Sequence, residues 1–206
     1  LGFKFLFLPK ENAAEAAIIK GMNIVPVSNL IELVDFLEER KEMVFQKPFQ
    51  IKFDSINEES LIGISDIKGQ ESAKRALTVA AAGGHNILMS GPPGAGKTML
   101  AQALISILPL PSLDEIIETT QIYSAAGALG NNPFVNFRPF RAPHHSASMV
   151  SVIGGGANPK PGEISLAHRG VLFLDEIPEF RRDLLESLRQ PLESGNVCIS
   201  RAKGSL

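Results

Sequence analysis

The chain is poor in cysteine, in long apolar runs and in net charge. Its single cysteine, Cys198, cannot form a disulfide within the chain, which fits a reducing cytosol. No apolar run approaches the ~20 residues that a membrane-spanning helix needs, so we expect a cytoplasmic protein without a membrane partner. The formal net charge of −2 gives no overall positive field that would recruit nucleic acid, although a local basic face is compatible with it.

A phosphate-binding loop is the most informative motif in the sequence. Gly91-Pro92-Pro93-Gly94-Ala95-Gly96-Lys97-Thr98 matches the G-x-x-x-x-G-K-[ST] pattern of nucleoside triphosphatases. An apolar run at residues 87–89 is of strand type, and residues 99–105 are of helix type, which is the context that the motif requires. Glycines lack a Cβ atom, so the backbone N–H groups can curl around phosphates, and the start of the helix adds the positive end of its dipole.

The loop predicts specific roles for its last residues. We expect Lys97 to reach the β- and γ-phosphates of ATP and the Thr98 hydroxyl to bind Mg²⁺. The alternative, a glycine-rich turn with a surface lysine, does not explain the flanking strand and helix patterns. The predicted nucleotide-binding residues of this segment are Gly91, Pro92, Pro93, Gly94, Ala95, Gly96, Lys97, Thr98 and Met99.

Two acids after an apolar run supply the second half of a hydrolytic site. Residues 170–174 read as a strand that is buried on both faces of a parallel sheet. Asp175 then lies at the carboxyl end of this strand, where ligands of open α/β sheets bind. We expect Asp175 to hold Mg²⁺ through water and Glu176 to orient or deprotonate the attacking water. The predicted catalytic residues are Glu176, Lys97 and Asp175, and the predicted metal ligands are Thr98 and Asp175. A solvated acidic turn is the alternative for the two acids alone.

The motifs together resemble those of AAA+ ATPases. The segment Asp66-Ile67-Lys68-Gly69-Gln70 precedes the first helix of the motor, and the resemblance implies that Ile67 and Gly69 line an adenine pocket. Residues 137–146, which read FRPFRAPHHS, and residues 154–168 are similar to the magnesium-chelatase-like branch, in particular its bacterial YifB/ComM group.

The resemblance also implies the fold and its division. We expect an α/β fold with the parallel sheet and flanking helices of a P-loop NTPase (AAA+), truncated, and preceded by a small βαβα piece. Residues 1–42 are similar to the end of a Lon-protease-like (ribosomal S5-like) domain, residues 43–62 read as a linker, and residues 63–206 are similar to the first part of the AAA+ motor. The chain starts without methionine, and we expect it to be a piece of a longer protein.

Family members assemble into rings, commonly hexamers, with ATP between subunits. The competence-associated members act as DNA helicases in branch migration, so the resemblance implies ATP and Mg²⁺ as cofactors and DNA and further copies of the chain as partners. The alternative is the motor subunit of a magnesium chelatase or another assembly complex, and a third class is a nucleotide-binding switch without turnover. The family's sensor residue, arginine finger and lid follow after Ser205, so we expect this fragment alone to be inactive.

Other polar residues leave alternatives open. Adjacent residues on an extended segment point opposite ways, so His144 and His145 are not expected to form a metal site. Arg138 and Arg141 alternate with phenylalanines, which fits either a nucleic-acid contact or an aromatic anchor with solvated arginines. Arg181, Arg182 and Arg189 belong either to a solvated helix face or to a surface that meets a neighbouring subunit's ATP.

Overall fold

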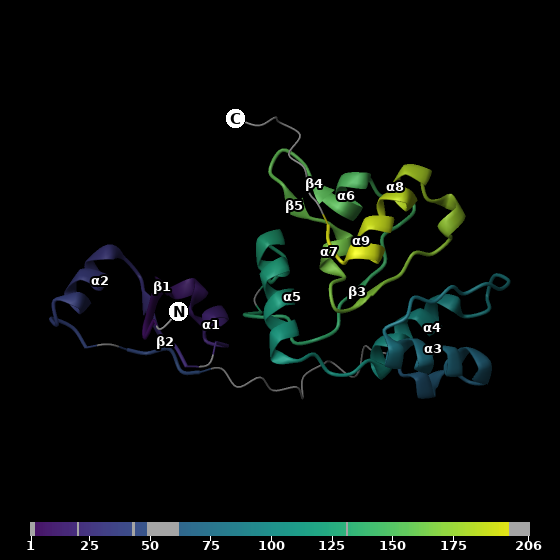
Figure 1. Cartoon of the computed structure of the whole chain (residues 1–206). Helices are drawn as coiled ribbons and strands as arrows, with labels where there is room; N and C mark the ends of the chain where they lie inside the picture. Colours follow the sequence, from purple (N-terminus) through teal and green to yellow (C-terminus); the bar gives the residue numbers. More distant parts are fainter. Residues whose placement is uncertain (1–2, 20, 43, 49–61, 131, 198–206) are drawn as a thin grey trace. The chain divides into compact units, whose positions relative to one another are not determined.

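A computed structural model of the chain describes residues 3–19, 21–42, 44–48, 62–130 and 132–197. The contacts divide the chain into two compact units (Figure 1). The first comprises Leu1–Asp54 with Asn131–Phe134, and the second comprises Ser55–Gly130 with Val135–Leu206. Within the described residues, no helix is long and apolar enough to cross a membrane.

The first unit has the β-α-β-α order that its sequence pattern predicts. Strand β1 (Phe5–Pro9) pairs in parallel with β2 (Asn23–Val27), and helix α1 (Ala13–Ala16) lies between them in the sequence after a 3-10 turn at Lys10–Asn12. Ile24 and Val25 of β2 form the buried centre of the unit. Helix α2 (Leu30–Leu37) is capped at its start, since the Asn29 side chain accepts a hydrogen bond of 2.8 Å from the Glu32 N–H group.

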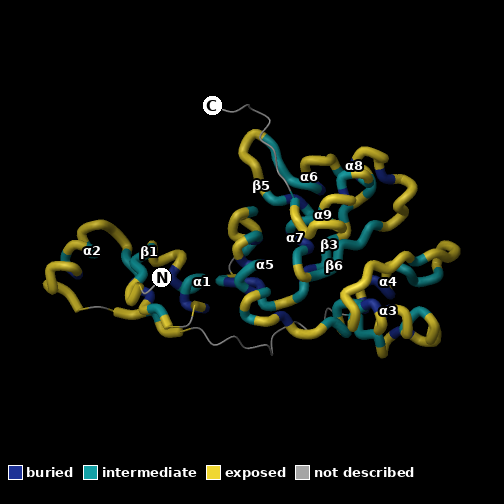
Figure 2. The backbone as a smooth tube through the Cα atoms, viewed as in Figure 1, coloured by how far each residue is buried: buried dark blue, intermediate teal, exposed yellow. Residues whose placement is uncertain are grey.

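The second unit begins with two packed helices. A 3-10 turn at Ile64–Asp66 leads into α3 (Glu71–Gly83), and α4 (Lys97–Ala103) continues into a 3-10 helix at Leu104–Ile107. Ile67, Leu77, Leu100 and Ala103 form their shared buried core. Figure 1 shows α3 and α4 side by side, and Figure 2 shows that each of these helices carries both buried and exposed residues.

The rest of the unit combines one long helix, α5, with short elements. Helix α5 (Leu113–Ala126) starts with a capping box between Ser112 and Glu115. Strand β3 (Phe140–Arg141) pairs in parallel with β6 (Val171–Leu172), and β4 (Gly154–Gly155) pairs antiparallel with β5 (Lys160–Pro161). The remaining helices are α6 (Met149–Ile153), α7 (Glu163–Leu166), a 3-10 helix at Ile177–Glu179, α8 (Arg182–Ser187) and α9 (Arg189–Ser194). The result is a mixed α/β fold with small sheets, two of them parallel.

The sheet is smaller than the sequence predicts. Residues 87–89 pair with no strand among the described residues, and the Leu88 side chain is 80% exposed. The apolar run 170–174 contributes only Val171 and Leu172 to a strand, and these residues are half-buried instead of covered on both faces. Among the described residues β6 pairs with one strand, β3. The other edge of β6 therefore makes no hydrogen bonds to a further strand that would extend it.

Proline accounts for a second difference. The sequence pattern predicts a helix from Asp183 to about Leu192, shortened if Pro191 ends it, and the chain forms α8 and then α9. The Pro191 ring would clash with the carbonyl four residues earlier in a continuous helix, so the helix restarts and Pro191 lies in the first turn of α9. The sequence pattern also predicts that a strand or hairpin begins at residues 196–200, most of which lie outside the described residues.

Arg138 holds three parts of the second unit together. Its guanidinium donates to both carboxylate oxygens of Glu115, at 2.9 and 3.1 Å, and to the carbonyl oxygens of Pro109, Leu110 and Arg169, at 2.9, 3.4 and 2.9 Å. The side chain is only 11% exposed. Arg141 is bound in the same bidentate way to Glu163. Both expectations are therefore wrong for Arg138, because its guanidinium is neither solvated nor available to nucleic acid. Arg141 is paired with Glu163, but its side chain is 34% exposed, so a nucleic-acid contact of this residue remains a prediction.

We predict that Arg138→Met lowers the free energy of unfolding by ~3 kcal/mol, because it leaves the Glu115 carboxylate without its partner in a largely buried setting. Urea unfolding of the full-length protein measures this loss. Arg182→Met is the matched control, since Arg182 is 93% exposed and pairs with Glu186 only at the surface of α8, so little change is expected.

The same pair predicts a pH dependence. The hydrogen bonds from Arg138 hold the pKa of Glu115 below its ordinary value of 4.5. A carboxylate with a lowered pKa in the folded state contributes stability above pH 4.5, and this contribution disappears as the pH falls through the folded-state pKa. We therefore expect the difference in stability between the parent and Arg138→Met to shrink on acidification below pH 4.5. A difference that stays constant over this range contradicts the assignment.

Candidate functional site

The phosphate loop adopts a backbone that only glycine reaches at little cost. Gly94 and Gly96 lie in the left-handed region, with φ of +79° and +78°. The Ala95 N–H group donates to the Pro92 carbonyl at 3.3 Å, and α4 starts directly after Gly96. Left-handed residues that alternate with right-handed ones turn successive N–H groups toward one concave face, which is the geometry of an anion-binding nest.

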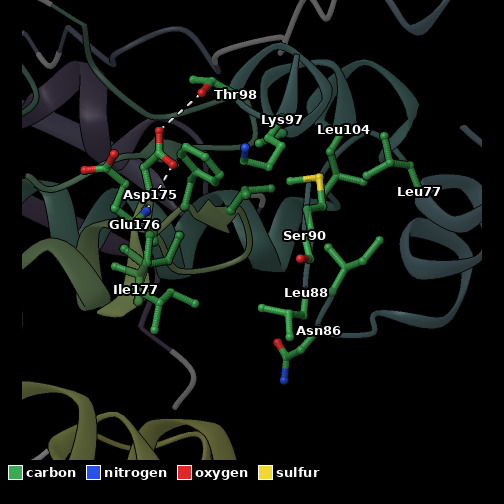
Figure 3. A pocket seen from close by; sticks show the side chains of 18 of the residues that line it. Leu77, Asn86, Leu88, Ser90, Lys97, Thr98, Leu104, Asp175, Glu176 and Ile177 are labelled. Carbon is green, nitrogen blue, oxygen red and sulfur yellow. Dashed lines mark hydrogen bonds between the residues drawn. The ribbon is translucent and has the colours of Figure 1, made fainter. Parts of the chain in front are cut away.

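Lys97 is held by the same loop. Its Nζ atom donates to the carbonyl oxygens of Gly91 and Pro92, at 3.0 and 3.1 Å. The ammonium group therefore lies against the loop, where it can move to phosphate oxygens without a change of backbone. Figure 3 shows Lys97 beside Thr98, on the side of the pocket that faces the two acids.

The two halves of the predicted site meet at Thr98 and Asp175. The Thr98 hydroxyl donates to Oδ2 of Asp175 at 3.3 Å, although the two residues are 77 positions apart in the sequence (Figure 3). The other oxygen of Asp175, Oδ1, accepts a bond of 3.0 Å from the Glu176 N–H group. Glu176 is itself left-handed, with φ of +53°, a conformation that persists for a residue with a side chain only where its surroundings impose it.

The donor set of Thr98 and Asp175 fits Mg²⁺. Hydroxyl and carboxylate oxygens are the hard ligands that this ion prefers, and its ligands at ~2.1 Å in an octahedron lie ~3 Å from their neighbours. The oxygens of Thr98 and Asp175 are separated by a similar distance. These two side chains would therefore hold one ion, Thr98 through its hydroxyl and Asp175 through water, as expected from the sequence.

An open cavity of about 1300 Å³ connects these groups. The predicted site residues that line it are Gly91, Pro93, Gly94, Gly96, Lys97, Thr98, Met99, Asp175 and Glu176. Pro92 and Ala95 belong to the loop but do not line the cavity. The cavity is large enough for a nucleoside triphosphate, and it joins the phosphate loop to both acids.

The residues expected at an adenine pocket are found elsewhere. The Ile67 side chain is buried against Leu77, Leu100 and Ala103, in the core that joins α3 and α4. Gly69 is exposed and left-handed, with φ of +70°. Neither residue lines the cavity, so their contact with a base remains a prediction.

The histidine pair does not have the expected arrangement. The rings of His144 and His145 do not point opposite ways but lie with their centroids 4.0 Å apart, and His145 also meets the edge of Phe180. Nδ1 of His145 comes within 4.0 Å of Oε2 of Glu176. No group of three or more potential metal ligands occurs in the described part of the chain. The sequence contained one indication that His145 lies near Glu176. His145 follows β3 and Glu176 follows β6, and two adjacent parallel strands end at the same edge of their sheet.

The arginines near the end of the chain lie on an exposed face. Arg181, Arg182 and Arg189 pair with Asp183, Glu186 and Glu193, respectively. The Arg181 guanidinium holds the pKa of Asp183 below its ordinary value through their hydrogen bonds. These local pairs agree with a solvated helix face, and contact with a neighbouring subunit's ATP remains a prediction.

Comparison with known proteins agrees with the motifs. The family model described as "Magnesium chelatase, subunit ChlI" matches residues 63–206. Competence protein ComM of Haemophilus influenzae is 48% identical over 98% of this chain, and the protein YifB of Escherichia coli is 44% identical over 98% of it. YifB of Salmonella typhimurium is also 44% identical. The chain spans about two fifths of the length of these relatives, with 40% of ComM and 39% of each YifB covered.

Gly170, directly before β6, gives a test of how Asp175 is positioned. A Cβ atom at this residue would lie 2.0 Å from the carbonyl oxygen of Pro139, which accepts the ladder bond from the Val171 N–H group. We predict that Gly170→Ala forces β6 away from β3 and costs about 3 kcal/mol in the free energy of unfolding, the upper end for overpacking.

Urea unfolding measures this cost, and Mg²⁺-dependent ATP affinity should fall with it because Asp175 follows β6. Gly91→Ala is the stability control, since its added Cβ would meet Ala95 Cβ at an ordinary 3.6 Å. Equal stability of the two variants would contradict the close approach of β6 to residue 139.

Proposed function

The chain belongs to the magnesium chelatase subunit ChlI family, as a YifB/ComM-like member, and we propose that it forms the nucleotide-binding part of an AAA+ motor that hydrolyses ATP. The observation that carries the proposal is the bond between Thr98 and Asp175, which joins the phosphate loop to the acidic strand end. A glycine-rich turn and a solvated acidic turn have no reason to meet 77 residues apart in the sequence.

Each residue then has a role in hydrolysis. The loop N–H groups bind the β- and γ-phosphates, and Lys97 exchanges the carbonyl oxygens of Gly91 and Pro92 for phosphate oxygens. Thr98 and Asp175 hold Mg²⁺, which neutralises charge on the phosphates when it is bound. Glu176 accepts a proton from the attacking water as general base. Nδ1 of His145 lies 4.0 Å from the Glu176 carboxylate.

We propose DNA as the substrate on which the motor acts, in recombination or competence, with a ring of subunits, six by the family pattern, in the cytoplasm. The relative ComM is named a competence protein, and this name supports DNA uptake or processing as the context. Arg138 does not supply the DNA contact in this proposal, because its guanidinium donates to Glu115 and to three carbonyl oxygens.

We also propose a division of the chain into domains. Residues 1–42 are the end of a Lon-protease-like domain, residues 43–62 are a linker, and residues 63–206 are the start of the motor.

The alternative is the motor subunit of a magnesium chelatase or of another protein-assembly complex. The description of the matching family favours this alternative in general terms. Both activities use the same ATP site. The effect of DNA on the rate of ATP hydrolysis therefore distinguishes them.

Substitutions in the full-length protein test the ATP site. We predict that Glu176→Gln keeps ATP affinity but lowers kcat by ~10²–10⁴, because an amide has the same shape and cannot accept the proton. Lys97→Ala should abolish ATP binding in calorimetric titration, since the phosphate charge loses its partner. Glu179→Gln, an acid three residues away that does not line the cavity, is the control and should hydrolyse ATP at the parent rate. Parent-rate turnover by Glu176→Gln assigns the base to another residue.

DNA titrations test the choice of partner. We predict that single-stranded or branched DNA binds the full-length protein, that its affinity falls steeply with salt as counterions are released, and that it raises the rate of ATP hydrolysis. The ATPase rate with and without DNA at several salt concentrations measures both effects. Absent binding at low ionic strength, together with unstimulated turnover, supports the chelatase-type alternative.

A further inference from the structure

Gln70 connects the start of α3 to the phosphate loop. Its side-chain Nε2 donates a hydrogen bond of 2.8 Å to the carbonyl oxygen of Ala95, 25 residues further along the chain. Nε2 also lies 3.6 Å from the position that a Cβ atom on Gly96 would take. Gly94 and Gly96 line the cavity, whereas Gln70 and Ala95 do not, so the amide contacts the loop on its outer side, away from the cavity.

The backbone of Gln70 supports the view that this contact is imposed. Gln70 is left-handed, with φ of +56° and ψ of 40°, and it follows Gly69, which is also left-handed. This conformation is unfavourable for a residue with a Cβ atom and persists where the surroundings determine it. The double left-handed turn directs the Gln70 side chain to Ala95, while Ile67 packs into the core against Leu100 and Ala103 of α4.

The bond to Ala95 fixes one peptide group of the loop. In a planar trans peptide the C=O of one residue and the N–H of the next point in opposite directions. A carbonyl of Ala95 that is held outward by Gln70 therefore keeps the Gly96 N–H group on the inner side. Without this donor the flexible glycines allow the peptide to rotate, and rotation would turn a carbonyl dipole toward the phosphates.

We propose that Gln70 is a positioning residue of the phosphate site, which holds the peptide between Ala95 and Gly96 in the orientation that binds a triphosphate. This inference rests on the proposed ATP-binding function and adds a residue that no phosphate-loop motif contains. It also gives the segment before α3 a second role, because Ile67 packs against α4 and Gln70 bonds the phosphate loop.

The experiment measures the affinity of the full-length protein for ATP and for inorganic triphosphate, with Gln70→Gly and Gln70→Glu. Glycine keeps the left-handed backbone without strain and removes the amide, so both ligands should bind about 3- to 10-fold more weakly, the effect of one neutral hydrogen bond. Glutamate keeps the shape but places a carboxylate against the carbonyl, so both affinities should fall by at least ~10-fold, since hydrogen bonds that involve charged groups carry larger effects. Glu71→Gln is the matched control, because Glu71 is highly exposed and its carboxylate bonds Lys74 on its own helix and no other side chain among the described residues.

The variant that loses more affinity distinguishes a positioning role of Gln70 from a packing role. A residue that only fills space is replaced better by the isosteric Glu than by Gly, whereas the proposal requires Glu to be the more damaging. Unchanged affinities in both variants, or Glu milder than Gly, overturn the proposal. A loss for ATP with unchanged binding of inorganic triphosphate also overturns it, because the effect would then act through the base. If the parent protein binds neither ligand, the proposed ATP function itself fails, which is a distinct result.

Discussion

The geometry of the candidate site depends on one buried guanidinium. Arg138 bonds the carbonyl oxygens of Pro109 and Leu110, which follow the 3-10 extension of α4, and the carbonyl oxygen of Arg169, just before β6. The phosphate loop lies at the other end of α4, and Asp175 lies beyond β6. Because a buried arginine is costly unless its donors are satisfied, the three segments are held together around it. The bidentate bond to Glu115 supplies the charge that the guanidinium needs.

Around the reacting groups lies a second set of residues that orient them. Gln70 holds the outer side of the phosphate loop, Arg138 holds the segments that carry the loop and the acids, and His145 lies beside the Glu176 carboxylate. Each of these contacts joins residues that are far apart in the sequence. The residues of the motifs therefore supply the chemistry, and these neighbours supply the orientation that the chemistry requires.

The sequence was sufficient for features that are encoded locally. The glycine pattern before Lys97 predicted the curled loop, and the pattern of residues 99–105 predicted the helix that follows it. It was not sufficient for contacts between distant segments. Spacing does not show that Arg138 is largely buried, that the rings of His144 and His145 lie next to each other, or that Ile67 belongs to a helix core. The apolar run at residues 87–89 has strand composition, but a strand also needs a neighbour, which sequence pattern alone does not supply.

The central claim is that Thr98 and Asp175 serve one Mg²⁺-dependent nucleotide site. A double-mutant cycle in the full-length protein tests it most directly, with the increase in ATP affinity caused by Mg²⁺ measured for the parent, Thr98→Val, Asp175→Asn and the double variant. If both oxygens bind the same ion, the second substitution should cost little after the first, with a coupling energy of at least ~1 kcal/mol. If the double variant loses the product of the two single-variant factors in Mg²⁺-dependent ATP affinity, the two residues act independently. That result would contradict the site described above.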